Sequence, residues 1–185
     1  MDAYYATPIG PFATAIGANF NTFTARQFVD PLPTPIIPAN VLRPGTRLKI
    51  EAEGEYGTTG TPTLVIGCAL GIPGATGSLG TPVVLAETRA ITTPSAAASF
   101  SWRLEYRGII TSTGTAATIV GEGQVDFSTS LTVNTSEPIP TTLALRTVTT
   151  IDTTIMRGVG IVATWGTSSV SNNIRVYQLT ALLMN

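Results

Sequence analysis

The chain has 185 residues, of which 43% are hydrophobic and only 11% are charged, and its formal net charge is -1. This length suits one domain with a sizeable core, and no apolar run approaches the roughly 18 residues of a membrane span. A single Lys beside nine Arg provides no basic patch for nucleic acid, and the absence of His excludes Ser-His-Asp and Cys-His catalysis. So few charges leave wide apolar surface, which is typical of a partner interface. We therefore expect an oligomer or an assembly component.

Residues 1–45 are expected to form an extended, proline-rich N-terminal arm. Residues 1–44 hold seven of the thirteen prolines and only four charges. Proline disfavours helix and inner strand because it lacks a backbone N–H and restricts the residue before it. The segment is too apolar for a solvated linker, so we expect it to lie along another surface. The expected anchors are Phe20, Phe23, Phe28, Ile36 and Ile37.

Residues 46–185 are expected to form an all-β domain. Short stretches rich in Thr, Val and Ile alternate with Gly, Pro, Asn and Ser, and helical spacing is almost absent. Eight strands suit a two-sheet β-sandwich, of which the jelly roll is the natural eight-strand form. The expected strands are 46–57, 62–70, 82–87, 98–112, 116–128, 143–151, 156–166 and 173–183.

Two of these strands alternate strictly between apolar and charged residues. In RLKIEAEGEY (47–56) the charged residues fall on one face, and FSWRLEYRG (100–108) has the same design. Together they hold eight of the twenty-one formal charges, four of each sign, so we expect neighbouring strands with opposite charges paired across them. The expected inward residues are Leu48, Ile50, Tyr56, Trp102, Leu104, Val125, Phe127, Val176 and Leu182.

The alternating carboxylates Glu51, Glu53 and Glu55 form the one cluster with a chemical alternative. Alternate residues of a strand lie about 6.5–7 Å apart, which overlaps the spacing of a glycosidase acid and base. Arg47 and Lys49 lie alongside, however, and a general acid needs a desolvated carboxyl. Calcium loops usually bunch Asp and Asn in a turn, which is not seen here. We interpret the glutamates as a solvated face and expect no catalytic residue, metal site or cofactor.

Three further motifs have ordinary structural interpretations. Cys68 lies in the apolar TLVIGCALG and is expected to be a buried structural thiol. GIPGATGSLG (71–80) resembles a phosphate loop, but a strand-like TPVVLAE follows instead of a helix, so we expect a loop connecting strands. The glycosylation-like NTS at 134–136 is expected to be a turn, SEPIPTT (136–142) an extended loop, and WGTSSVSNN (165–173) a turn between the last two strands.

Longer stretches resemble a known group of proteins. IPANVLRPGTRLKIEAEGEYGTTGTPTLVIG, FSWRLEYRGIITSTGTAATIVGEGQV, EPIPTTLALRTVTTIDTT and VGIVATWGTSSVSNNIRVYQLTALL are together similar to virion structural proteins of tailed bacteriophages, especially those of actinobacteria. The similarity covers nearly all of residues 37–183, and members resemble capsid decoration (minor capsid) proteins or minor tail proteins. It implies a β-sandwich, symmetric oligomers such as a homotrimer, and no catalysis.

The resemblance leads to the following expectations about function. The protein is expected to be a head decoration protein on the capsid exterior that binds the major capsid protein and itself, with no nucleic-acid or membrane partner. The alternative is a minor tail or receptor-binding module that recognises a host surface glycan. The start of the chain, MDAYYATPIG, has no basic region before an apolar stretch, so we expect no secretory signal and synthesis in the host cytoplasm.

Overall fold

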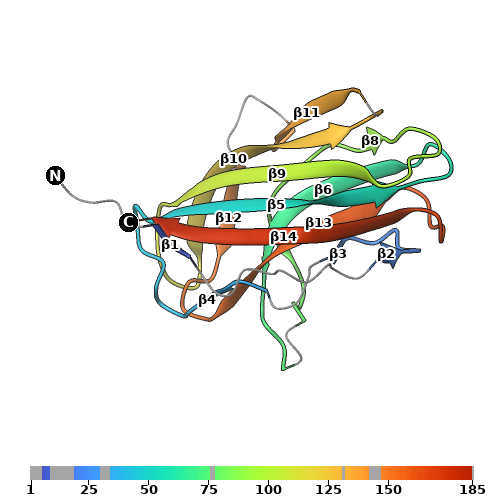
Figure 1. The fold of residues 1–185 in the computed structure, drawn as a ribbon. Helices are drawn as coiled ribbons and strands as arrows, with labels where there is room; N and C mark the ends of the chain where they lie inside the picture. The colour runs from blue at the N-terminus through green and yellow to red at the C-terminus, as the bar shows by residue number, and fades with distance from the viewer. Residues whose placement is uncertain are drawn as a thin grey trace.

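The computed structural model describes residues 6–8, 19–29, 34–75, 78–130, 132–141 and 147–184. All regular structure in these ranges is β-strand, and two antiparallel sheets pack against each other as a β-sandwich (Figure 1). The strands are β1 Ala6–Pro8, β2 Phe20–Asn21, β3 Gln27–Phe28, β4 Ile36–Ile37, β5 Arg47–Gly57, β6 Thr63–Gly71, β7 Val83–Glu87, β8 Ile91–Thr92, β9 Phe100–Ile110, β10 Ala117–Ser128, β11 Asn134–Ile139, β12 Thr147–Ile151, β13 Arg157–Trp165 and β14 Asn173–Met184.

The eight-stranded sheet has the order β1-β14-β5-β9-β10-β11, with β12 also paired to β10 and β2 to β14. The six-stranded sheet has the order β3-β13-β6-β7, with β4 also paired to β13 and β8 to β6. Figure 1 shows β14, β5 and β9 side by side in one layer, with β6 and β13 in the layer behind them. The all-β, two-sheet fold is therefore confirmed, and the jelly-roll form stays a prediction.

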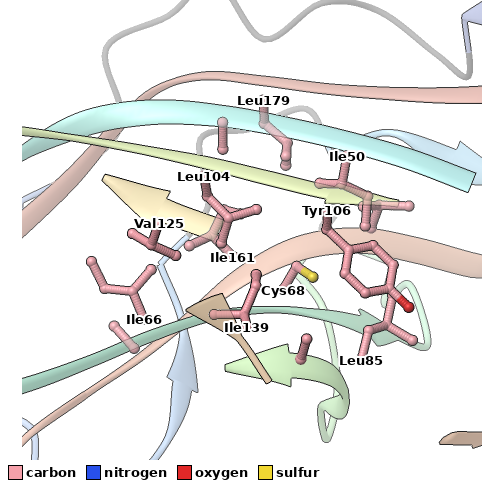
Figure 2. Packing of buried hydrophobic residues seen from close by; sticks show 14 of the residues in the cluster. Ile50, Ile66, Cys68, Leu85, Leu104, Tyr106, Val125, Ile139, Ile161 and Leu179 are labelled. Carbon is pink, nitrogen blue, oxygen red and sulfur yellow. The ribbon is translucent and has the colours of Figure 1, made fainter. Parts of the chain in front are cut away.

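The core lies between the sheets and follows from the alternation in the long strands. Leu48 and Ile50 of β5 and Leu104 of β9 are completely buried, as the period of two predicts. Ile50 and Leu104 point toward the layer that holds Ile66 of β6 and Ile161 of β13, which are also completely buried (Figure 2). Full burial of such a side chain stabilises the fold by about 1.5–3 kcal/mol, so this interface between the sheets supplies most of the driving force for folding.

One inward prediction is wrong because β14 contains a β-bulge. The pairing of β14 with β5 shifts register between Val176 and Gln178, which leaves Tyr177 as an extra residue. A bulge inverts the alternation beyond it. Val176 therefore points inward as predicted, whereas Leu182 is on the partly exposed side and Leu183, 7% exposed, takes the core position.

Proline-containing residues 134–139 form a strand, which corrects two sequence interpretations. β11 pairs antiparallel with β10 from Asn134 opposite Ser128 to Ile139 opposite Gly123. The NTS motif is thus part of a strand and not a turn, and the segment from 136 is not wholly a loop. Pro138 is tolerated because β11 is at the end of the strand order, where a missing backbone N–H costs no ladder hydrogen bond.

The described parts of residues 1–45 pack on the chain's own sandwich. β2 pairs with the start of β14, and β3 and β4 both pair with β13. Phe23, Val29 and Ile37 are 8%, 0% and 1% exposed and belong to the same core cluster as the main strands. These short pairings of two residues each satisfy backbone groups of β13 without requiring a proline N–H.

This packing corrects the expectation that the anchor side chains need another surface. Phe23 and Ile37 are buried within the chain and are not available for docking. Phe20, Phe28 and Ile36 remain partly exposed, so a docking role for these three stays a prediction. Removing residues 1–36 would also remove core residues, and such a truncation would test folding as well as attachment.

Candidate functional site

The candidate site is the face of the eight-stranded sheet that points away from the core, which we call the outer face. It is formed by alternate residues of β14, β5, β9 and β10 and is flanked by β11 and β12. Because the strands are paired in register, outward residues align in rows that cross the sheet. One row runs from Met184 through Arg47, Ile109 and Val120 to Val148.

β5 and β9 are neighbours as predicted, and one of their three directly opposed charged pairs, Glu53 with Arg103, joins opposite charges. Lys49 is opposite Arg107, and Glu51 is opposite Glu105, so like charges stand side by side. The ion pairs form along a strand or diagonally instead. Lys49 Nζ is 3.0 Å from Glu51 Oε1 and 3.9 Å from Glu105 Oε1, and Arg107 Nη2 is 2.5 Å from Glu105 Oε1. The predicted pairing of opposite charges across the two strands is therefore confirmed for diagonal neighbours, such as Lys49 with Glu105 and Arg103 with Glu51, but it fails in register at two of the three directly opposed charged pairs.

The three glutamates of β5 have different surroundings. Glu51 lies between Lys49 and Arg103, whose Nη2 is 3.7 Å from its Oε1. Glu55 is 3.6 Å from Arg175 Nη1, and its side chain is only 16% exposed. Glu53 is exposed and makes no hydrogen bond or ion pair within the described residues. The described residues hold no group of three or more His, Cys, Asp or Glu that could bind a metal ion.

At one end of the outer face, apolar side chains gather into an apolar row, which we define as Ile109, Val120, Val148 and Met184. Val148 is 63% exposed and Ile109 is 37% exposed. The row borders a depression of about 570 Å³ that is also lined by Arg47, Lys49, Arg107 and Glu122. No local sequence pattern indicates this feature, because the four residues come from four strands and only the pairing of those strands brings them together.

At the opposite end, polar side chains surround a second hollow of about 470 Å³, which we call the polar groove. Ser101 Oγ and Ser128 Oγ are 2.7 Å apart, and Ser128 Oγ donates a hydrogen bond to Asn134 Oδ1 at 2.9 Å. The full lining comprises Glu53, Gly54, Glu55, Ser99, Ser101, Trp102, Arg103, Asp126, Phe127, Ser128, Asn134 and Tyr177. Glu53 and Glu55 were considered from the sequence, whereas the partners from β10, β11 and β14 were not.

The other motifs have structural roles in the described residues. Cys68 is completely buried as predicted, and burial raises the pKa of its thiol. Residues 71–80 connect β6 to β7, where the Gly74 N–H donates to Ser78 O at 2.8 Å and the Gly80 N–H donates to Ile72 O at 2.9 Å. Gly77 lies outside the described residues. These observations confirm the loop connecting two strands.

Comparison of the chain with protein-family models, with curated proteins and with solved structures gave no match. No helix in the described part of the chain is long and apolar enough to cross a membrane.

Proposed function

We propose that this protein is a structural component of a tailed-bacteriophage virion, and specifically a head decoration protein. The resemblance of residues 37–183 to virion structural proteins supports this proposal, as does the β-sandwich built from a sparsely charged chain. The partners are the major capsid protein and further copies of this chain, arranged as a trimer on the capsid exterior.

The observation that carries the proposal is the apolar row. The outward face of a solvated sheet usually presents polar residues, and contiguous exposed apolar side chains mark an interaction surface. Here Ile109 and Val148 are exposed in the same row, and Val120 lies between them in register. Arg47 and Lys49 beside the row add a charged rim, which is the usual composition of a protein interface.

Attachment can be measured on capsids of the same phage that were assembled without the protein. Val148→Glu places a charge in the apolar row and is expected to reduce capsid occupancy by tenfold or more, because a charge buried without a partner in an interface costs several kcal/mol. Val170→Glu is the matched control, since Val170 is 74% exposed in the turn before β14 and away from the row. Equal occupancy for both variants would contradict the assigned surface.

The position of the protein on the virion tests the assignment to the head. Antibody labelled with gold is expected to decorate heads of intact virions. Label on tail tips and none on heads would overturn the proposal in favour of a minor tail or receptor-binding module. The polar groove is the observation that favours this second candidate, because such a module needs a surface that recognises a host glycan.

A further inference from the structure

We propose that the polar groove is a binding site for uncharged sugar residues of a glycan. This inference does not depend on whether the protein is on the head or the tail of a virion. The groove lies in two adjacent rows of the outer face and crosses β14, β5, β9, β10 and β11. Strands are spaced about 4.8 Å apart, so four steps give a length of about 19 Å, which exceeds one sugar ring.

The β-bulge of β14 adds an aromatic ring to the groove. Strict alternation would place only one residue between the inward residues Val176 and Leu179. Because the bulge adds a residue, both Tyr177 and Gln178 lie on the outer face. Bulges recur where a strand redirects a side chain towards a binding site. Tyr177 lines the groove, and the neighbouring Glu55 carboxylate raises the pKa of its phenol. A tyrosine ring can pack on the apolar C–H face of a sugar while its hydroxyl group stays in contact with water.

Acceptors for sugar hydroxyls are present beside the ring and are not used by the protein. Arg103 is in register between Glu53 and Asp126, yet its guanidinium is turned to Glu51 at 3.7 Å. Glu53 is left without a hydrogen bond or ion pair among the described residues, and Asp126 accepts only a long bond of 3.4 Å from Gln124. Both carboxylates line the groove, where each can accept from two hydroxyl groups of a ligand.

The groove also provides hydrogen-bond donors, and its balance of charges favours a neutral ligand. Arg103 lines the groove with a side chain that is 62% exposed, and the amide of Asn134 supplies N–H groups. Hydroxyl groups, which both donate and accept, complement this mixture of carboxylates, guanidinium, amide and serines. An anionic ligand would meet three carboxylates against one arginine and be repelled. A basic peptide would also satisfy the charge, and the experiment below separates it from a neutral sugar.

The test begins with the full-length protein on an array of neutral, amino-containing and acidic oligosaccharides, followed by calorimetric titration of the strongest neutral oligosaccharide. Glu53→Gln and Tyr177→Ala are each expected to weaken binding by about tenfold, because the first replaces a charged hydrogen-bond acceptor by a neutral one and the second removes the ring that packs on the sugar. Glu122→Gln is the matched control: it makes the same charge change on an exposed residue of β10 outside the groove, and binding should be unchanged.

Several results would overturn the proposal. Absence of array binding, binding only to acidic glycans, or equal loss in Glu122→Gln would each exclude the groove as a neutral-sugar site. A basic peptide that binds with an affinity falling steeply with salt, while neutral sugars do not bind, would assign the groove to a different ligand class. Thermal unfolding of every variant separates lost binding from lost folding, and Asp126→Asn provides a second conservative variant.

Discussion

The outward faces of the two sheets have opposite character. On the eight-stranded sheet, the outward residues of β5 and β9 are mostly charged and partly exposed. On the six-stranded sheet, three consecutive outward pairs of β6 and β13 consist of glycine, alanine and valine and are buried; they are Gly67 with Val162, Ala69 with Gly160 and Gly71 with Gly158. Small outward residues let other segments approach closely, whereas charged residues keep the other face in water.

We call the outward side of these three pairs the small face. The pair Gly71 and Gly158 shows how this face is covered. A Cβ atom added to Gly71 would lie 2.8 Å from Leu79 Cβ and 3.0 Å from the ring of Phe28, and one added to Gly158 would meet Leu79. The loop after β6 and the segment around β3 therefore cover this end of the six-stranded sheet. Among the described residues, the outer face of the eight-stranded sheet is therefore the more exposed of the two and the better placed to meet ligands and partners.

The largest effect is expected when a side chain is added to the small face. In Gly67→Ala the new Cβ would lie 2.4 Å from Ala86 O, a backbone atom that cannot move without disturbing the pairing of β6 with β7. We expect a loss of about 3 kcal/mol or more in the free energy of unfolding. Gly60→Ala is the control, because no atom lies within 4 Å of its Cβ position. Equal urea midpoints for the two variants would contradict the close packing.

A cavity on the small face should cost more than the same truncation on the exposed face. Val162→Ala removes two methyl groups from a residue that is 1% exposed, and the loss should be about 2 kcal/mol. Val148→Ala makes the same change where the side chain is 63% exposed, and it should cost less than about 0.5 kcal/mol. Chemical denaturation of both variants measures the difference, which would vanish if the two faces were equally solvated.

Tyrosines on the inner side of the eight-stranded sheet make stability depend on pH only under alkaline conditions. Burial raises the pKa of Tyr56 to about 12 and raises the pKa of Tyr106 as well. Tyrosine in an unfolded chain ionises near pH 10. Above that pH the unfolded state loses phenol protons that the folded state retains, so the contribution of these tyrosines to the free energy of unfolding should fall as pH rises from about 10 through about 12. Cys68, whose thiol pKa is also raised by burial, adds to this fall from about pH 8.5, where the thiol of an unfolded chain ionises.

Urea midpoints across this range check that expectation. In Tyr56→Phe the fall should be shallower, because one raised pKa is removed together with the hydrogen bond from the phenol to Ser128 O. A midpoint that is independent of pH above 10 would mean that the phenols are solvated in the folded state.

The smallest effect is expected on the charged face. Glu53→Gln should change the free energy of unfolding by less than about 0.5 kcal/mol, because exposed charges on a sheet contribute little. Oligomeric state by light scattering should also be unchanged. Loss of the oligomer in this variant would mean that the charged residues of β5 form an interface between subunits.

Local patterns in the sequence were enough to locate the main strands. The alternation in RLKIEAEGEY and FSWRLEYRG assigns every inward and outward residue of β5 and β9, because a period of two is a property of each strand by itself. The apolar runs of β6 and β13, which lack a polar side, likewise indicate strands that are buried on both faces. The all-β class and the burial of Cys68 follow from the same local information.

The site, in contrast, was decided by tertiary pairing. No local signal reveals the bulge at Tyr177, which moves Leu183 to the core in place of Leu182, because a bulge exists only relative to a partner strand. The burial of Phe23 and Ile37 depends in the same way on β13 and β14 being available to pair with the N-terminal segment. The apolar row and the polar groove each draw on several strands far apart in the chain, and which strands become neighbours is settled by long-range packing rather than by local periodicity.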